Sequence, residues 1–122
     1  MKKNKFYYFI IFISFNLFLL PVKSDPMFDL GKDVFLNKAV CSTCHTLVDA
    51  GSYGQIGPNL NEIKPDKMRV MNTVTYGIGV MQAYEGELTS EEIEAVAHYV
   101  SISASQYFFI FFCLKFLIFS KH

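Results

Sequence analysis

The sequence predicts a small all-α domain, and three observations lead to this class. Apolar residues recur at helical spacing in three segments, and each segment is preceded by residues that favour the start of a helix. No run alternates between apolar and polar residues with period two, so no β-sheet is expected. Removing an N-terminal export segment, residues 1–24, from the 122-residue chain leaves 98 residues, the length of one small domain.

The first 24 residues have the organisation of a signal peptide. Three lysines lie within residues 1–5, residues 6–20 are almost entirely apolar, and the small residue Ser24 precedes Asp25 at a suitable cleavage site. An apolar helix of this length is too short for a bilayer core of roughly 30 Å, which disfavours an uncleaved anchor. We therefore expect residues 1–24 to direct export to the periplasm, or to an equivalent compartment such as the thylakoid lumen, and then to be removed.

The exported chain is predicted to begin with a helix. Asp25 is a favourable N-cap, and Pro26 suits the first helical position. The apolar positions that follow at helical spacing are Phe28, Gly31, Val34 and Phe35.

The pentapeptide Cys41-Ser42-Thr43-Cys44-His45 comes next, and its C-x-x-C-H pattern is typical of c-type haem attachment. Cys41 and Cys44 can each form a thioether with a haem vinyl group, and His45 can bind the iron as an axial ligand. The alternatives are a thioredoxin-like redox pair, half of a zinc site, or coincidence. A zinc site needs a second pair of ligands, whereas the remaining candidates, Cys113, His98 and His122, are isolated. No strand–helix–strand pattern near the motif supports a thiol oxidoreductase. The sequence therefore predicts one covalently attached haem c.

A glycine-rich loop and a second helix are predicted after the motif. Residues 49–61 contain Gly, Pro and Asn at the density of a loop. Pro65-Asp66 is expected to begin the second helix, which Gly77 and Gly79 end. Its predicted apolar face consists of Met68, Val70, Met71 and Val74.

The methionines of the exported chain are candidates for a second axial ligand, because thioether sulfur favours ferrous iron and raises the reduction potential of the haem. Met27, Met68, Met71 and Met81 are the candidates. Met68 and Met71 fall within a helical pattern, where methionine more often fills the core. Met81 instead follows two loop glycines, which let a backbone approach a flat cofactor. The pattern therefore favours Met81.

The last predicted helix begins with a capping box formed by Thr89 and Glu92, flanked by a hydrophobic staple of Leu88 and Ile93. Its predicted buried stripe consists of Ile93, Val96, Ala97 and Val100.

A hydrophobic tail, residues 106–122, follows a domain predicted to span residues 25–105. The thirteen residues 107–119 contain a central Lys115 and are too short to cross a bilayer as a helix. Three roles remain open for the tail: association with the membrane, binding of a partner, or an incidental extension of the reading frame. Cys113 belongs to this tail and is not expected to be a ligand.

The charge of the exported chain argues against nucleic acid as a partner. Residues 25–122 contain 7 basic and 11 acidic residues, a net charge of −4. Proteins that bind nucleic acid carry a basic surface instead.

Residues 28–101 resemble the class I cytochromes c, in particular the small monohaem carriers of bacteria and photosynthetic organisms. The segments that carry the resemblance are Gly31 and Phe35 with Tyr99, the haem motif, Gly57-Pro58-Asn59-Leu60, and Gly79-Val80-Met81-Gln82-Ala83-Tyr84 followed by residues 88–93. The resemblance implies three to four short helices wrapped around one covalently bound haem, with crossing N- and C-terminal helices. It implies that the Pro58 carbonyl accepts the ring N–H of His45, and that Met81 is the distal ligand. Gln82 stands where the family usually has proline.

These observations predict a function in electron transfer. An iron bound by both His45 and Met81 has no open position for a substrate, and one haem carries one electron. We therefore expect a periplasmic one-electron carrier rather than an enzyme. Its expected partners are redox proteins, either respiratory or photosynthetic membrane complexes or a periplasmic dehydrogenase. The alternative is a haem enzyme or gas binder of the peroxidase type, in which Met81 is labile.

Overall fold

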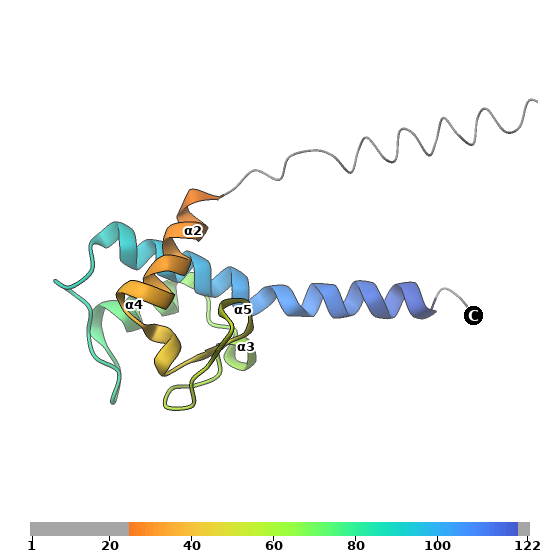
Figure 1. The fold of residues 1–122 in the computed structure, drawn as a ribbon, viewed down its shortest axis with the longest axis horizontal. Helices are drawn as coiled ribbons and strands as arrows, with labels where there is room; N and C mark the ends of the chain where they lie inside the picture. Colours follow the sequence, from red (N-terminus) through yellow and green to blue (C-terminus); the bar gives the residue numbers. More distant parts are fainter. Residues whose placement is uncertain (1–24, 120–122) are drawn as a thin grey trace, which may run out of the picture.

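The computed structural model describes the backbone of residues 25–119 and the side chains of residues 25–105. The predicted signal peptide and the side chains of the predicted tail lie outside these ranges. The helices are α2 (Pro26–Asp33), α3 (Leu60–Ile63), α4 (Lys67–Tyr76) and α5 (Ser90–Phe119), joined by the short helical turns η1 (Val34–Lys38), η2 (Cys41–Thr43) and η3 (Val48–Ala50). The described part of the chain is mostly helical, as predicted (Figure 1).

Helix α2 begins as its sequence predicts. The Asp25 side chain accepts hydrogen bonds from the amides of Met27 and Phe28, at 3.1 and 3.4 Å, and Pro26 occupies the first position. The helix continues directly into η1, a π-helical turn. Because of this continuation, the predicted apolar face extends to Val34 and Phe35, which are both fully buried.

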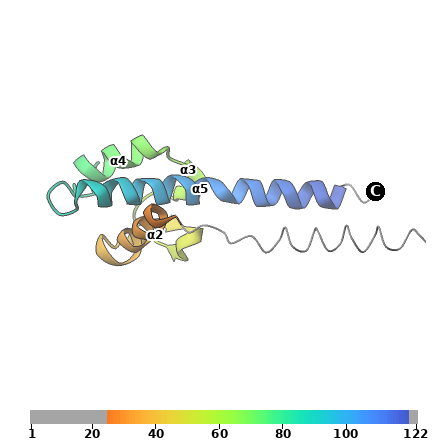
Figure 2. The ribbon, with the colours of Figure 1, turned by 90° about the horizontal axis from the view of Figure 1, so that it is seen from above.

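Helices α2 and α5 cross in close contact at Gly31. A Cβ atom at Gly31 would lie 2.0 Å from the Ala95 carbonyl oxygen and 2.7 Å from the Tyr99 Cβ, so only glycine allows this approach. The buried Tyr99 ring meets the rings of Phe28 and Phe35 edge-on, with centroids 4.9 and 5.7 Å away. Helix α2 therefore lies across the N-terminal half of α5, as the resemblance implied (Figures 1 and 2).

Polar contacts reinforce this crossing from two directions. The Tyr99 hydroxyl donates to Asp49 Oδ2 at 2.8 Å, and Lys32 Nζ lies 2.9 Å from the same oxygen. Burial, followed by the contact with the Asp49 carboxylate, raises the pKa of Tyr99. These bonds connect η3, which follows the haem motif, to both helices of the crossing.

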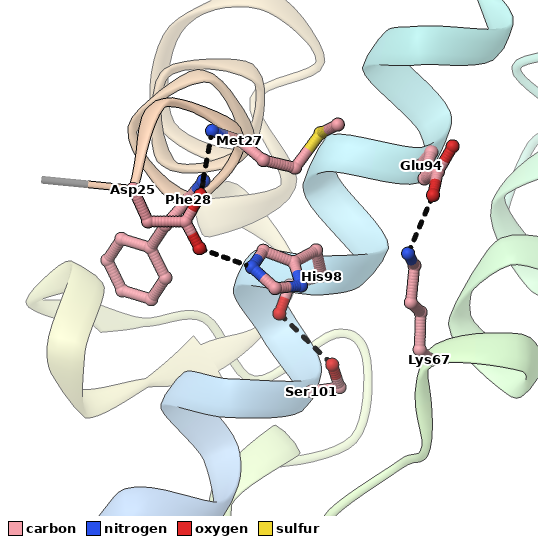
Figure 3. A network of polar contacts seen from close by, with 7 residues as sticks. All are labelled: Asp25, Met27, Phe28, Lys67, Glu94, His98 and Ser101. Atoms are coloured by element: carbon pink, nitrogen blue, oxygen red, sulfur yellow. Dashed lines mark hydrogen bonds and ion pairs between the residues drawn. The ribbon is translucent and has the colours of Figure 1, made fainter.

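Two side-chain contacts hold the partly exposed side of α5, as Figure 3 shows. His98 Nε2 lies 2.7 Å from Asp25 Oδ2, at the start of α2, and Glu94 Oε1 lies 2.7 Å from Nζ of Lys67, the first residue of α4. The His98 hydrogen bond is the largest of the effects that lower the pKa of Asp25. Helix α5 is thus fastened to the starts of two other helices.

The expectation that the chain has no β-sheet is wrong in one detail. Thr46–Leu47 (β1) pairs antiparallel with Ser52–Tyr53 (β2). The buried Ser52 hydroxyl accepts the Leu47 N–H at 3.0 Å inside this hairpin. Strands of two residues are too short for an alternating pattern to become visible in a sequence. The predicted loop over 49–61 likewise contains most of η3, all of β2 and the first two residues of α3.

Helix α4 begins and ends where predicted, but its apolar face is narrower. Asp66 accepts the Arg69 N–H at 2.9 Å, and Gly77 ends the helix with φ 72°. Val70 and Val74 are buried as expected. Met68 is 63% exposed, so its predicted place in the core is wrong. Only one edge of α4 faces α5 and the cavity described below, and Met68 lies off that edge.

The start of α5 confirms the predicted capping box. The Thr89 N–H donates to Glu92 Oε2 at 2.9 Å, and the Glu92 N–H donates to Thr89 Oγ1 at 3.2 Å. The predicted staple and stripe are buried: Leu88, Ile93, Val96, Ala97 and Val100.

Helix α5 continues without interruption past residue 105 to Phe119 and projects beyond the other helices (Figures 1 and 2). Within the part of the chain that the structure describes, no helix combines the length and apolar character needed to cross a membrane. The role of residues 106–122 remains a prediction.

Candidate haem site

A cavity of about 430 Å³ lies between the haem motif, the loop around Pro58, α4 and the loop before α5. Cofactor sites usually measure roughly 300–1,000 Å³ and have mainly apolar walls with a few polar groups. All the site residues predicted from the sequence line this cavity: Cys41, Cys44, His45, Pro58 and Met81. The structure therefore brings together residues that are up to 40 positions apart in the sequence.

The haem motif forms a tight turn that directs its three reactive side chains to the cavity. The amides of Cys44 and His45 both donate to the Cys41 carbonyl, at 3.1 and 3.0 Å. Burial raises the pKa of the Cys41 thiol to about 11. The cysteines of redox-active pairs have a lowered pKa instead. The surroundings of Cys41 thus disfavour the thioredoxin-like alternative.

Val40, directly before the motif, has a left-handed backbone with φ 51°. This conformation is unfavourable for a β-branched residue. The Val40 side chain is 47% exposed and lines the cavity. Backbone strain of this kind is found where the surrounding structure requires an unusual conformation, and here it sets the direction in which the chain enters Cys41.

The His45 ring has a defined tautomer because its Nδ1 lies 3.0 Å from the Pro58 carbonyl oxygen. A carbonyl oxygen only accepts hydrogen bonds, so Nδ1 carries the proton and Nε2 keeps a free lone pair. This is the bond that the resemblance implied for Pro58. It leaves Nε2 in the chemical state that a metal ligand requires.

Two glycines that the sequence analysis did not single out as site residues make this arrangement possible. A Cβ at Gly57 would lie 2.4 Å from His45 Cε1 and 2.7 Å from Nδ1, and a Cβ at Gly54 would lie 2.5 Å from the carbonyl carbon of Cys44. The Gly57 N–H also donates to the Cys44 carbonyl at 2.8 Å. The loop therefore packs directly against the motif. The signal in the sequence was the glycine immediately before Pro58.

Met81 is held at the end of a two-residue hairpin turn. Its amide donates to the Ile78 carbonyl at 2.9 Å, and the Ile78 amide donates to the Met81 carbonyl at 3.1 Å. Gly79, the first central residue, has φ 57°, while Val80 is not among the residues with positive φ, which is the pattern of a type II′ turn. A Cβ at Gly77 would lie 2.7 Å from the Met81 carbonyl oxygen. The glycines that marked this loop in the sequence therefore shape the backbone on which Met81 sits.

The other candidate methionines do not line the cavity. Met71 is partly buried against the hydrophobic core and Met68 is exposed. Met27 lies in the first turn of α2. Among the methionines of residues 25–105, Met81 is the one that lines the cavity.

Arg69 and Tyr84 also line the cavity and were not predicted as site residues. Arg69 is the lining residue with a permanent positive charge. Tyr84 packs partly against the core and donates its hydroxyl to the Ala39 carbonyl at 3.1 Å. Tyr84 belongs to the segment that carries the family resemblance, but the spacing of residues assigns neither Tyr84 nor Arg69 to the site, because their place there depends on contacts between distant segments.

The residues of the cavity fit a covalently bound haem. Two thiols and an imidazole with a free Nε2 come from one turn, and a thioether sulfur comes from another loop. Sulfur and imidazole nitrogen are the usual axial ligands of haem iron in cytochromes c. The remaining wall is mainly aliphatic and aromatic, as a large flat apolar cofactor requires.

Comparisons with known proteins identify the family. The family model described as cytochrome C oxidase, cbb3-type, subunit III matches residues 27–100, which include the whole cavity. Cytochrome c6 from Microcystis aeruginosa is 32% identical over 80 residues, which cover 62% of this chain and 96% of that protein. The crystal structure of the c-type cytochrome SorU from Sinorhizobium meliloti is similar with a TM-score of 0.63 and 52% sequence identity, covering 66% of this chain and 94% of that chain.

The predicted fold and cofactor are thus confirmed, and the relatives support a general role as an electron carrier that exchanges electrons with redox proteins. The chain belongs to this family of small class I c-type cytochromes and carries a covalently bound haem c.

Proposed function

We propose that the chain is a periplasmic one-electron carrier in which His45 and Met81 are the axial ligands of the haem iron. When bound, haem c supplies an iron that changes between the ferric and ferrous states. The contribution of the protein is to hold both ligands in place so that neither position is open to a substrate.

The observation that carries the proposal is the convergence of His45 and Met81 on one cavity, each fixed by its own hydrogen bonds. The Pro58 carbonyl orients the His45 ring, and the two bonds with Ile78 fix the backbone of Met81. Ligands held in this way need little rearrangement when the charge of the iron changes. Small rearrangement is what electron transfer requires, since the surrounding dipoles are already oriented.

The rest of the cavity supports the same role. Its wall is mainly apolar, and Arg69 offers a cation to the carboxylate groups of a haem. Apolar residues of the wall, among them Val40, Ile56, Ile63, Ile78 and Val80, offer apolar contact to a bound haem.

The predicted location follows from residues 1–24 and from the haem motif together. We propose that the chain is exported and that haem attachment is completed outside the cytoplasm. The expected partners are membrane complexes or a periplasmic dehydrogenase. Fractionation of cells that express the full chain tests this location, and haem-stained protein confined to the cytoplasm would contradict it.

The ligand assignment is tested by spectroscopy of purified oxidised protein. A weak near-infrared band from sulfur-to-iron charge transfer is expected in the wild type and should be absent from Met81→Ala. Met68→Ala and Met71→Ala are the matched controls, because they remove the same thioether outside the cavity. Retention of the band in Met81→Ala would show that the assignment is wrong.

The alternative function, a peroxidase-like enzyme or gas binder, depends on release of Met81. Gln82, which stands in place of the usual proline, is the observation that favours this alternative. The Gln82 side chain is exposed, and its hydrogen bond to Glu87 Oε2 is long, at 3.5 Å, so it constrains the loop less than a proline would. The two backbone bonds with Ile78 oppose release. Rapid binding of carbon monoxide by the reduced wild type, or peroxide turnover that is lost in His45→Ala, would support the alternative.

A further inference from the structure

Tyr84 connects three segments that surround the cavity. Its N–H donates to the Val74 carbonyl of α4 at 2.9 Å, and its carbonyl accepts the Leu88 N–H at 3.0 Å, just before α5. Its hydroxyl donates to the Ala39 carbonyl at 3.1 Å. The hydroxyl bond therefore joins residues 45 positions apart in the sequence.

The two residues joined by this bond lie close in the sequence to residues of the haem site. Tyr84 follows Met81 by three residues, while Ala39 precedes Cys41 by two residues and ends η1. A carbonyl at the end of a helical turn lacks a partner within the helix. The Tyr84 hydroxyl supplies the hydrogen bond that the Ala39 carbonyl would otherwise lack. A tyrosine hydroxyl is protonated at neutral pH and able to donate, and burial raises the pKa of Tyr84 further.

We infer that the Tyr84 hydroxyl is a positioning group that ties the Met81 loop to the segment carrying Cys41, and thereby keeps the Met81 sulfur on the iron. The inference rests on the proposed role of Met81 as a ligand. A movement of the loop away from the iron that displaces Tyr84 breaks the Tyr84–Ala39 bond. The bond therefore adds to the cost of replacing Met81 by an external ligand.

Tyr84→Phe is the sharpest test, because it removes one oxygen and keeps the ring that packs against the core. The measurement is the binding of imidazole to the oxidised holoprotein, followed by loss of the sulfur-to-iron band. From the usual net contribution of one hydrogen bond, we expect imidazole to bind about 2- to 12-fold more tightly to Tyr84→Phe than to the wild type.

Two controls separate positioning from general stability. Tyr76→Phe makes the same chemical change at a tyrosine that is 70% exposed and outside the cavity lining, and should bind imidazole as the wild type does. Thr89→Ala weakens the cap of α5 and lowers the stability of the fold without removing a cavity residue. Thr89→Ala should change the affinity for imidazole less than Tyr84→Phe does, even if it lowers the free energy of unfolding by the same amount or more.

The outcomes distinguish this inference from the proposed function. Equal imidazole affinity of Tyr84→Phe and the wild type, or an equal change in Thr89→Ala, would overturn the positioning role while the ligand assignment stands. If the wild type lacks the sulfur-to-iron band and its spectrum is the same as that of Met81→Ala, both the positioning role and the ligand assignment are overturned.

Discussion

The glycine at the helix crossing gives a prediction whose size can be worked out from the structure. In Gly31→Ala, the new methyl group would lie 2.0 Å from the Ala95 carbonyl oxygen, 2.6 Å from its carbon and 2.7 Å from the Tyr99 Cβ. Two of these atoms are backbone, so no side-chain rotation relieves the contact and the helices must separate. Overpacking usually costs 1–3 kcal/mol, and a contact this short calls for the upper end, about 3 kcal/mol. Replacing a helical glycine by alanine returns about 1 kcal/mol.

The expected result is a net loss of about 2 kcal/mol in the free energy of unfolding. With a slope of roughly 3 kcal/mol per molar guanidinium chloride, the unfolding midpoint should fall by about 0.7 M. Circular dichroism of the holoprotein during a guanidinium titration measures this shift. Gly51→Ala is the control, because its Cβ meets no atom within 4 Å and only its φ of 62° is unfavourable. That variant should lose about 1 kcal/mol. A midpoint for Gly31→Ala equal to that of the wild type would refute the close crossing.

Three further predictions concern other parts of the chain. Asp25→Asn keeps a good helix cap but removes the carboxylate, whose pKa His98 holds below the ordinary 3.8. A lowered pKa stabilises the folded state only while the group is ionised. The difference in unfolding free energy between wild type and variant should therefore be largest above about pH 4 and vanish as the pH falls through the lowered pKa of Asp25. Guanidinium titrations from about pH 6 to 2 measure this difference. Val40→Asn should raise stability by about 1 kcal/mol in the same titration at neutral pH, since asparagine tolerates a positive φ better. Truncation after Ser105 should leave the visible spectrum and the potential unchanged, because the cavity-lining residues end at Val100; membrane fractionation of both chains then separates an anchoring tail from an incidental one.

The parts of the fold that depend on neighbouring residues could be predicted from the sequence. The cap at Asp25, the capping box of Thr89 and Glu92, and the end of α4 at Gly77 each involve residues at most four positions apart. The haem motif is equally local. These signals are read directly from spacing because the atoms that meet are close in the chain.

Features that depend on tertiary contacts could not be predicted in the same way. The exposure of Met68 is set by the position of α4 against its neighbours, not by helical period. The approach of Gly57 to the His45 ring and the bond from Tyr84 to Ala39 join segments 12 and 45 positions apart. The position of Met81 could be predicted in part. The spacing of the glycines indicated a loop, but only the fold shows that this loop faces the haem motif.

The crossing of α2 and α5 also has a consequence for the order of events during biosynthesis. Gly31 and Ala95 are 64 positions apart, so closing the chain between them costs about 4 kcal/mol of entropy before their contact contributes anything. At roughly 5–20 residues per second, α2 is synthesised several seconds before its partner. During that interval the fold cannot close, and Cys41 and Cys44 remain on an open chain. The glycine contact at the crossing therefore forms only after Ala95 has been synthesised, so the two helices cannot hold the chain closed before the domain is nearly complete.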